Sequence, residues 1–134
     1  MPLNPAYCIE VEQLSFDDNA ALHALLKQES RPTAVVASDD ILAVSLERIC
    51  AQEGISIPED LSIVSFNNSL FARITSPQLT SMDINSHQLG IEAASQLINH
   101  MENPNLMATK IIVPHSLVIR DSCQEITPCR TGMC

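Results

Sequence analysis

The sequence predicts an α/β fold, a partial doubly wound parallel sheet with helices on both faces. Apolar runs of strand length alternate along the chain with longer segments whose apolar residues recur at helical spacing. The strand candidates 33–37 and 61–66 are almost wholly apolar, as expected for strands that are covered on both faces. Small polar residues directly follow both runs, at the edge where an open parallel sheet binds ligands. The sequence therefore predicts a small-molecule site at the carboxyl ends of neighbouring strands.

Composition narrows the class of protein. The chain has 134 residues, 46% of them hydrophobic, which suffices for one folded domain with its own core. Sixteen acidic residues against seven basic ones give a net charge of −9, and no helix-turn-helix pattern or basic arm is present. Because nucleic-acid binding needs clustered Lys and Arg, this stretch is not expected to contact DNA itself. No apolar run reaches the roughly 18 residues of a membrane span, and the start has no signal-peptide pattern. We therefore expect a cytoplasmic protein without membrane contact.

Cysteine and glycine usage argue against a metal site and against catalysis. The odd count of five cysteines favours free thiols over a disulfide framework. The alternative is a zinc site formed by Cys123, Cys129, Cys134 and His115. Such a site would lack the close cysteine pairs that are typical of structural zinc. With three glycines, no Gly-rich phosphate loop can be assembled, and no Ser/His/Asp or Cys/His arrangement is visible. We expect no metal, no cofactor and no enzyme activity.

The N-terminal segment should contain a strand and a helix. Residues 7–11 (YCIEV) form a short strand candidate. Ser15 and Asp18 have the spacing of a capping box, which begins a helix with an apolar face at helical spacing. This helix should end near residues 28–30, because Pro32 disfavours helical backbone at the residue before it.

The middle of the chain has the order strand, helix, strand. After the strand at 33–37, a helix is expected from Asp39 to Glu53, with an acidic first turn that complements the helix dipole. Gly54 suits the left-handed residue that ends many helices. The second strand follows at 61–66, and a long connection then runs to Gln78.

A further strand and helix follow this connection. Residues 79–82 form a short strand candidate. Asn85, with Gln88 three residues later, can cap a helix that runs to about Met101. The sequence at 103–105 (NPN) then breaks the helix.

Two strand pieces close the predicted fold, at 111–113 and 117–119. From Asp121 onward the chain is polar and is expected to fray. The chain is thus expected to form one domain, 1–122, followed by a flexible tail, 123–134.

Candidate binding residues follow the two central strands. Ser38 and Asp39 follow the first strand, and Asn67 follows the second. A purely structural explanation is also open, because Asp39 suits a helix N-cap and Asn67 with Asn68 suits a tight turn. The connection after the second strand carries three large apolar residues, a composition that often marks a protein contact: Leu70, Phe71 and Ile74.

Four phrases occur in a fixed order: PTAVVASDD, GISIPEDLSIVSFNNS, SPQLTSMDINSHQLGIEAASQLI and VPHSLVIRDS. In order and spacing they resemble the C-terminal portion of the LacI/GalR family of bacterial transcription repressors, over about residues 5–122. The wording SFNNSL and DINSHQLG looks most like the maltose-operon repressors of that family.

The resemblance implies a Rossmann-like, type I periplasmic-binding-protein-like fold. Such a core has two lobes with a sugar effector in the cleft between them, and a separate headpiece that binds DNA. This chain would hold only the C-terminal portion, and the helix at 85–102 would belong to the other lobe. Without that lobe, the apolar stripe of the helix would need another copy of the chain or a rearrangement to cover it. The partners implied are a sugar, a second copy of the chain, and DNA only through the headpiece.

The resemblance also implies roles for individual residues. Ser38, Asp39 and Asn67 would hold sugar hydroxyls. Asn67 stands where the family usually has Asp, and its uncharged amide both donates and accepts, which suits a neutral sugar. Ser38 stands where the family usually has Asn. The homodimer would form through apolar residues of one helix and the loop after the second strand: Leu42, Leu46, Ile49, Leu70, Phe71 and Ile74.

Two other classes stay open at this point. A solute-binding protein of a sugar transport system would share the fold but would be exported and monomeric. A small α/β enzyme would share the sheet, but the missing catalytic and phosphate-binding motifs argue against it.

Overall fold

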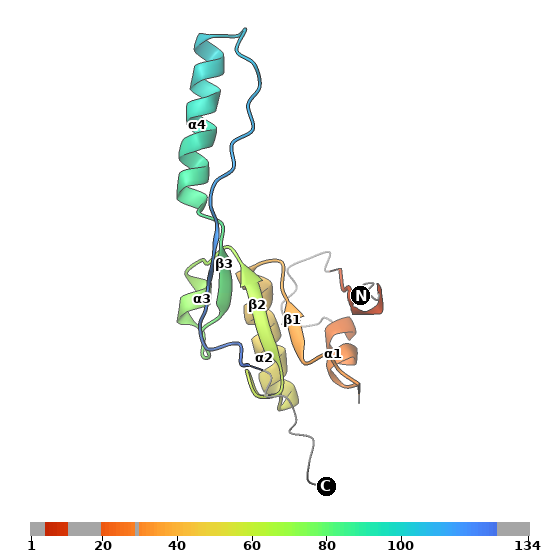
Figure 1. The fold of residues 1–134 in the computed structure, drawn as a ribbon. Coiled ribbons are helices and arrows are strands. Elements are labelled where there is room, and N and C mark those ends of the chain that lie inside the picture. Colours follow the sequence, from red (N-terminus) through yellow and green to blue (C-terminus); the bar gives the residue numbers. More distant parts are fainter. Residues whose placement is uncertain (1–4, 11–19, 29, 126–134) are drawn as a thin grey trace, which may run out of the picture.

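The computed structural model describes residues 5–10, 20–28 and 30–125. Its elements in chain order are η1 (Pro5–Tyr7), α1 (Ala20–Leu26), β1 (Ala34–Val36), α2 (Asp40–Glu53), β2 (Ser62–Phe66), α3 (Phe71–Ile74), β3 (Thr80–Asp83), α4 (Ser86–Glu102) and β4 (Ser116–Val118). The four strands form one sheet in the order β1-β2-β3-β4 (Figure 1). The first three strands are parallel, and β4 pairs antiparallel with β3. The predicted α/β class with a mostly parallel sheet is confirmed.

The core lies on one face of this sheet. Buried residues of α1, α2 and α3, such as Leu26, Leu46 and Ala72, form one cluster with Ile63 of β2. Side chains alternate along a strand, so Val36 and Phe66 lie on the opposite face, and both are exposed. In the described part of the chain, helices pack on one face of the sheet rather than on both.

Helix α2 begins and ends where the sequence predicts. Asp39 is its N-cap, with extended backbone, and its Oδ1 accepts a hydrogen bond of 2.8 Å from the backbone N–H of Leu42. Gly54 ends the helix in the left-handed region, at φ 71°. Asp39 thus fixes where α2 begins after β1, and Gly54 fixes where it ends.

The predicted strand at residues 7–11 is wrong in the part that the structure describes. Pro5–Tyr7 forms a 3-10 turn, closed by a hydrogen bond of 3.0 Å from the Cys8 N–H to the Pro5 carbonyl. Proline suits the first position of a helical turn, because its fixed φ is already helical. The capping box at Ser15 and Asp18 lies outside the described residues.

The elements after β2 differ from the prediction in three places. The long connection contains the short helix α3, which the sequence analysis does not predict. Asn85 is the N-cap of α4, but its backbone is left-handed and its side chain makes no capping bond. Gln88, the expected capping partner, donates instead to Glu92 at 2.9 Å. Residues 111–113 are not a strand, because the chain there runs back along α4, away from the sheet (Figure 1).

The expected fraying from Asp121 onward is also wrong for the first residues of that stretch. Ser122 is fully buried, and its hydroxyl donates to the carbonyl of Ile63 at 2.6 Å and accepts from the N–H of Thr80 at 2.8 Å. A polar residue is buried here because it satisfies backbone groups of β2 and β3. Residues 126–134 lie outside the described part.

Helix α4 projects away from the sheet and the core (Figure 1). None of its residues is buried, and several large apolar side chains are exposed: Leu89, Ile91, Leu97, Ile98 and Met101. The assignment of this helix to another lobe stays a prediction. Within the described residues, no helix has both the length and the apolar character to cross a membrane.

Candidate functional site

The carboxyl ends of the three parallel strands meet at one edge of the sheet. Val36 of β1 pairs with Val64 of β2, and Asp39 and Asn67 each stand three residues after one of these partners, beyond the end of its own strand. The N–H of Asn67 donates to the carbonyl of Met82 at 2.9 Å, which ties the end of β2 to β3. The sequence-predicted residues Ser38, Asp39 and Asn67 therefore lie on neighbouring strand tips, where open parallel sheets bind ligands.

Asp39 combines the two roles that its sequence position allows. Its Oδ1 caps α2, and its Oδ2 forms no hydrogen bond with any residue that the structure describes. The side chain is half-buried rather than sealed in the core. The N-cap role therefore leaves one carboxylate oxygen open to a ligand hydroxyl.

The two asparagines after β2 differ in their contacts. Both have positive φ, 94° for Asn67 and 46° for Asn68, as the turn explanation predicts. The side chain of Asn68 is occupied, because its Nδ2 donates to Asp83 at 3.0 Å and its Oδ1 accepts from Arg120. The Asn67 side chain is exposed and makes no hydrogen bond within the described ranges. Only Asn67 is therefore free to hold a ligand.

A buried carboxylate lies directly beneath these tips. Asp40 is 2% exposed, and its Oδ1 accepts hydrogen bonds from the hydroxyls of Ser65 at 2.6 Å and Ser81 at 2.7 Å. Its Oδ2 accepts the backbone N–H of Ser69 at 2.6 Å. Burial by itself raises the pKa of Asp40, but these hydrogen bonds outweigh burial and hold the pKa below its ordinary value. Asp40 is therefore ionised at neutral pH and fixed by two strands and a turn.

Sequence reasoning missed this carboxylate as a part of the site. It assigned Asp40 only to the helix dipole, although the residue also forms the floor under the strand tips. One signal was available: Ser65 stands between Val64 and Phe66 in the strand, at a position that faces the core. An inward-facing serine needs a buried partner, and the sequence does not say which residue supplies it.

Asp83, at the tip of β3, is a second acidic residue that the sequence analysis did not select. The backbone N–H of Asn85 donates to it at 2.7 Å, and the Asn68 side chain donates as well. These bonds, the first above all, lower the pKa of Asp83. Together with Arg120, Asp83 holds Asn68 in place beside Asn67.

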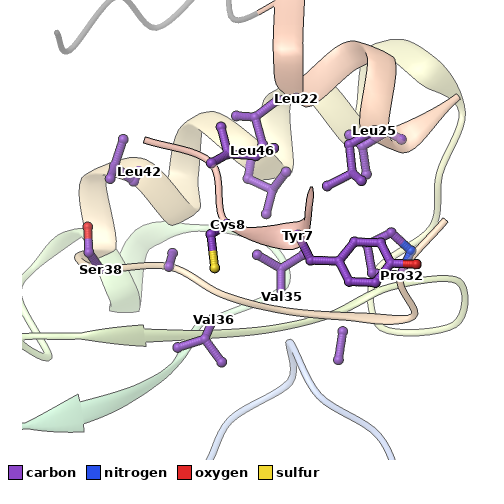
Figure 2. Close-up of a pocket in the computed structure, with 14 residues that line it drawn as sticks. Tyr7, Cys8, Leu22, Leu25, Pro32, Val35, Val36, Ser38, Leu42 and Leu46 are labelled. Carbon is purple, nitrogen blue, oxygen red and sulfur yellow. The ribbon is translucent and has the colours of Figure 1, made fainter. Parts of the chain in front are cut away.

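A cavity among the described residues reaches these tips only at Ser38. It has a volume of about 450 Å³ and lies between β1, α1, α2 and the segment around Cys8 (Figure 2). Its wall is mostly apolar, with Ser38 at one end and Leu22, Leu25 and Leu46 along it. A sugar needs several hydrogen-bond partners, and neither Asp39 nor Asn67 lines this cavity. The strand tips, rather than this cavity, carry the polar chemistry.

The six residues expected at a subunit interface separate into two groups. Leu70, Phe71 and Ile74 are 69%, 44% and 64% exposed, on and beside α3. Leu46 and Ile49 are 3% and 2% exposed and belong to the core, because that side of α2 packs against the sheet. The expectation that these two face a partner is wrong. Leu42 is partly buried against the same core.

Glu47 of α2 lies beside the end of α3. Its Oε1 is buried and has no hydrogen-bond partner in the described part of the chain. Burial raises the pKa of Glu47 to about 7, and the nearby hydroxyl of Thr75 offsets only part of the effect. The junction of α2 and α3 thus contains a carboxyl that titrates near neutral pH.

The cysteines that the structure describes, Cys8, Cys50 and Cys123, carry free thiols. Two cysteines of the alternative zinc site, Cys129 and Cys134, lie outside the described residues. Among residues 5–10, 20–28 and 30–125, no cluster of His, Cys, Asp and Glu has the arrangement of a metal site.

The sequence is similar to a known domain family and to proteins of known function. Residues 4–123 match the model of the periplasmic binding protein-like domain. The ribose operon repressor of Haemophilus influenzae is 33% identical over 121 residues, which are 90% of this chain and 36% of that protein. The arabinose metabolism transcriptional repressor of Geobacillus stearothermophilus is 37% identical over 100 residues, 74% of this chain and 28% of that protein.

The solved structures that match this chain also include transcriptional regulators. A LacI transcriptional regulator from Bacillus cereus subsp. cytotoxis matches with a TM-score of 0.76 at 39% identity, over 80% of this chain and 38% of that one. A LacI family regulator from Enterococcus faecium with bound ribose matches with a TM-score of 0.72 at 28% identity, over 79% and 39%. This chain therefore spans well under half the length of the proteins that it matches. These relatives and neighbours are transcriptional regulators, not enzymes.

Proposed function

The chain belongs to the periplasmic-binding-protein-like domains of LacI-type transcriptional regulators, and from this we propose that it forms the C-terminal part of a repressor's effector-binding and dimerisation region. The repressor would control genes of sugar utilisation. As a regulator of transcription it would act in the cytoplasm, and its contact with DNA would go through a headpiece outside these residues. The matched relatives are named as repressors, which favours a regulator over a transport protein.

The observation that carries the proposal is the alignment of polar residues at the strand tips. Ser38, Asp39 and Asn67 lie on two neighbouring tips, with free polar groups above a fixed floor. An open carboxylate oxygen accepts from a sugar hydroxyl, and an uncharged amide both donates and accepts. These groups form one wall of a sugar site, whose other wall belongs to the second lobe.

The proposed effector is a neutral sugar. The names of the relatives mention ribose and arabinose, and neighbouring structures contain ribose or cellobiose. The phrases SFNNSL and DINSHQLG resemble the maltose-operon repressors, and this resemblance favours maltose as the effector of this chain. In each case the sugar must bind one arrangement of the lobes better than the other, because a ligand with equal affinity for both shifts nothing.

The proposed dimer forms through the exposed apolar residues of α3 and its N-cap. Leu70, Phe71 and Ile74 lie next to each other on the surface and are anchored beneath by the buried Ala72. Clustered large apolar side chains on a surface mark a contact with another protein. We propose that the contact is with a second copy of the same region.

Calorimetry on the complete reading frame that contains this chain tests the proposal. Maltose, ribose, arabinose and cellobiose are the probes, and one of them should bind. Asn67→Ala and Asp39→Ala should each weaken that binding by about tenfold or more, since each removes a hydrogen-bonding group from the site. Asn105→Ala, in an exposed turn away from the tips, is the matched control and should bind as the parent does. Binding of none of the four sugars, or equal weakening by the control, would overturn the proposal.

A further inference from the structure

The turn between β2 and α3 is held from below by one buried side chain, that of Asp40. Two consecutive backbone N–H groups of this turn point into the same polar cluster beneath it. The Ser69 N–H donates to Asp40 at 2.6 Å, and the Asn68 N–H donates to the Ser81 hydroxyl at 3.0 Å. That hydroxyl in turn donates to Asp40 at 2.7 Å. Both backbone groups are therefore held, directly or through one hydroxyl, by the Asp40 carboxylate.

This turn is also the shortest path between the two proposed functional surfaces. Asn67, the free ligand residue, lies two residues before Ser69, and Leu70 lies one residue after it. Helix α3 has only four residues, so its position depends on its contacts with the rest of the chain, among them the packing of buried Ala72 in the core. One contact is the bond from Ser69 to Asp40, and another is the bond of 2.9 Å from the Leu79 N–H to the Ala72 carbonyl. A shift of the strand tip must change one of these contacts or be passed on to α3.

We propose that Asp40 is a positioning residue that couples the strand tips, where the sugar is held, to the exposed surface of α3, where subunits meet. The coupling rests on the proposed function, because it names how the site communicates with the interface. Asp40 touches neither the sugar nor the partner. It fixes Asn68 and Ser69 relative to β2 and β3, so that the tip and α3 move as one unit.

The chemistry of the cluster suits this role. A carboxylate accepts two hydroxyls on Oδ1 and one amide on Oδ2, and it has no proton to give away. All three groups therefore donate to the Asp40 carboxylate, which gives the cluster one defined hydrogen-bond arrangement. An amide in place of the carboxylate has one acceptor oxygen and one donor nitrogen, so at least one of the three donors loses its acceptor.

Hydrogen exchange on the purified 134-residue chain separates this role from simple stabilisation. Asp40→Asn and Ser81→Ala should speed exchange at residues 68–74 by about tenfold, as expected for the loss of one hydrogen bond to a charged group. Exchange at the N–H of Ile63, which donates to the Ser122 carbonyl at 2.8 Å in the core of the sheet, should change much less. Equal acceleration at both places would mean that Asp40 only stabilises the fold, and unchanged exchange at 68–74 would also overturn the proposal.

Ser45→Ala is the matched control. Ser45 is a buried serine of α2 whose hydroxyl donates to the Ile41 carbonyl within the helix, outside the Asp40 cluster. It should leave exchange at 68–74 as in the parent chain. If Asp40→Asn does not fold, Ser81→Ala keeps the test decisive, because it removes only one hydroxyl.

The link to the sugar needs a second measurement on the complete reading frame. A saturating sugar from the panel should slow exchange in α3 of the parent protein, and Ser81→Ala should reduce this protection at full occupancy. Retained protection in the variant would overturn the coupling. If no sugar binds, the proposed function fails, whereas the exchange comparison without sugar still decides whether Asp40 positions the turn.

Discussion

The guanidinium of Arg120 donates a hydrogen bond to the side-chain oxygen of Asn68, a residue 52 positions earlier in the chain. The same guanidinium donates to the backbone carbonyl of Leu79. One side chain from the end of the fold thus joins the turn after β2 to the start of β3. This contact keeps Asn68 occupied and leaves Asn67 as the free asparagine of the site.

Replacing this arginine tests how much the contact contributes. Arg120→Ala should lower the free energy of unfolding by about 1–3 kcal/mol, because it leaves the Asn68 oxygen and the Leu79 carbonyl without their donor. Arg31→Ala is the control, since Arg31 makes a surface ion pair of 3.4 Å with Asp60 that should contribute about 0–1 kcal/mol. Urea unfolding measures both. Equal losses for the two variants would contradict the assignment.

Glu47 should make stability depend on pH between its ordinary pKa and its folded pKa. The folded pKa of about 7 lies above the ordinary 4.5, so the folded chain binds more protons than the unfolded chain between these values. Stability from this group is present below pH 4.5 and is lost as the pH rises through 7. Glu47→Gln should therefore be more stable than the parent at pH 8, by about 1–3 kcal/mol after allowance for partial exposure, and the gain should disappear near pH 4.5. Urea unfolding at several pH values that gave one constant difference would refute this.

The exposed apolar residues of α3 should make the chain associate with itself. The double variant Leu70→Ser/Ile74→Ser should shift the chain toward monomer at tens of micromolar, measured by light scattering, because it removes apolar surface from the proposed contact. The matched variant Leu97→Ser/Met101→Ser removes equally exposed apolar surface from α4. If only the α4 variant is monomeric, or if the parent chain is monomeric, α3 is not the interface.

The 134-residue chain should bind sugar weakly or not at all. The described tips supply one wall of the proposed site, and a sugar held from one side keeps most of its surface in water. Calorimetric titration with maltose checks this prediction. Tight binding by the isolated chain would show that the site is complete without a second lobe.

Two glycines offer a matched test of the backbone. Gly54 ends α2 at φ 71°, with no atom within 4 Å of an added Cβ, so Gly54→Ala should cost about 1 kcal/mol through backbone conformation alone. Gly90 lies within α4 and also has open space around it, but it has helical backbone. Gly90→Ala should not destabilise the chain and should raise its helix content, since alanine favours helix. Thermal unfolding followed by circular dichroism compares the two.

Much of the fold could be predicted because local rules govern it. The extent of α2 follows from Asp39 and Gly54, and the apolar runs mark β1 and β2. The placement of Ser38, Asp39 and Asn67 at one edge follows from the parallel order of those strands. Where the local signal was weak the prediction was wrong, as for the strand at 7–11.

What the sequence by itself determined is the order of elements and the polar tips, because helical and strand periodicities and caps act between residues a few positions apart. The tertiary structure decided which side chains are buried. Asp40 finds its hydroxyl donors 25 and 41 positions away, and Ser122 finds the Ile63 carbonyl 59 positions away. It also decided that Leu46 turns into the core while Leu70 stays in water. Burial depends on which distant segments pack together. The periodic pattern of one segment shows that it has an apolar face but does not show which segment covers that face.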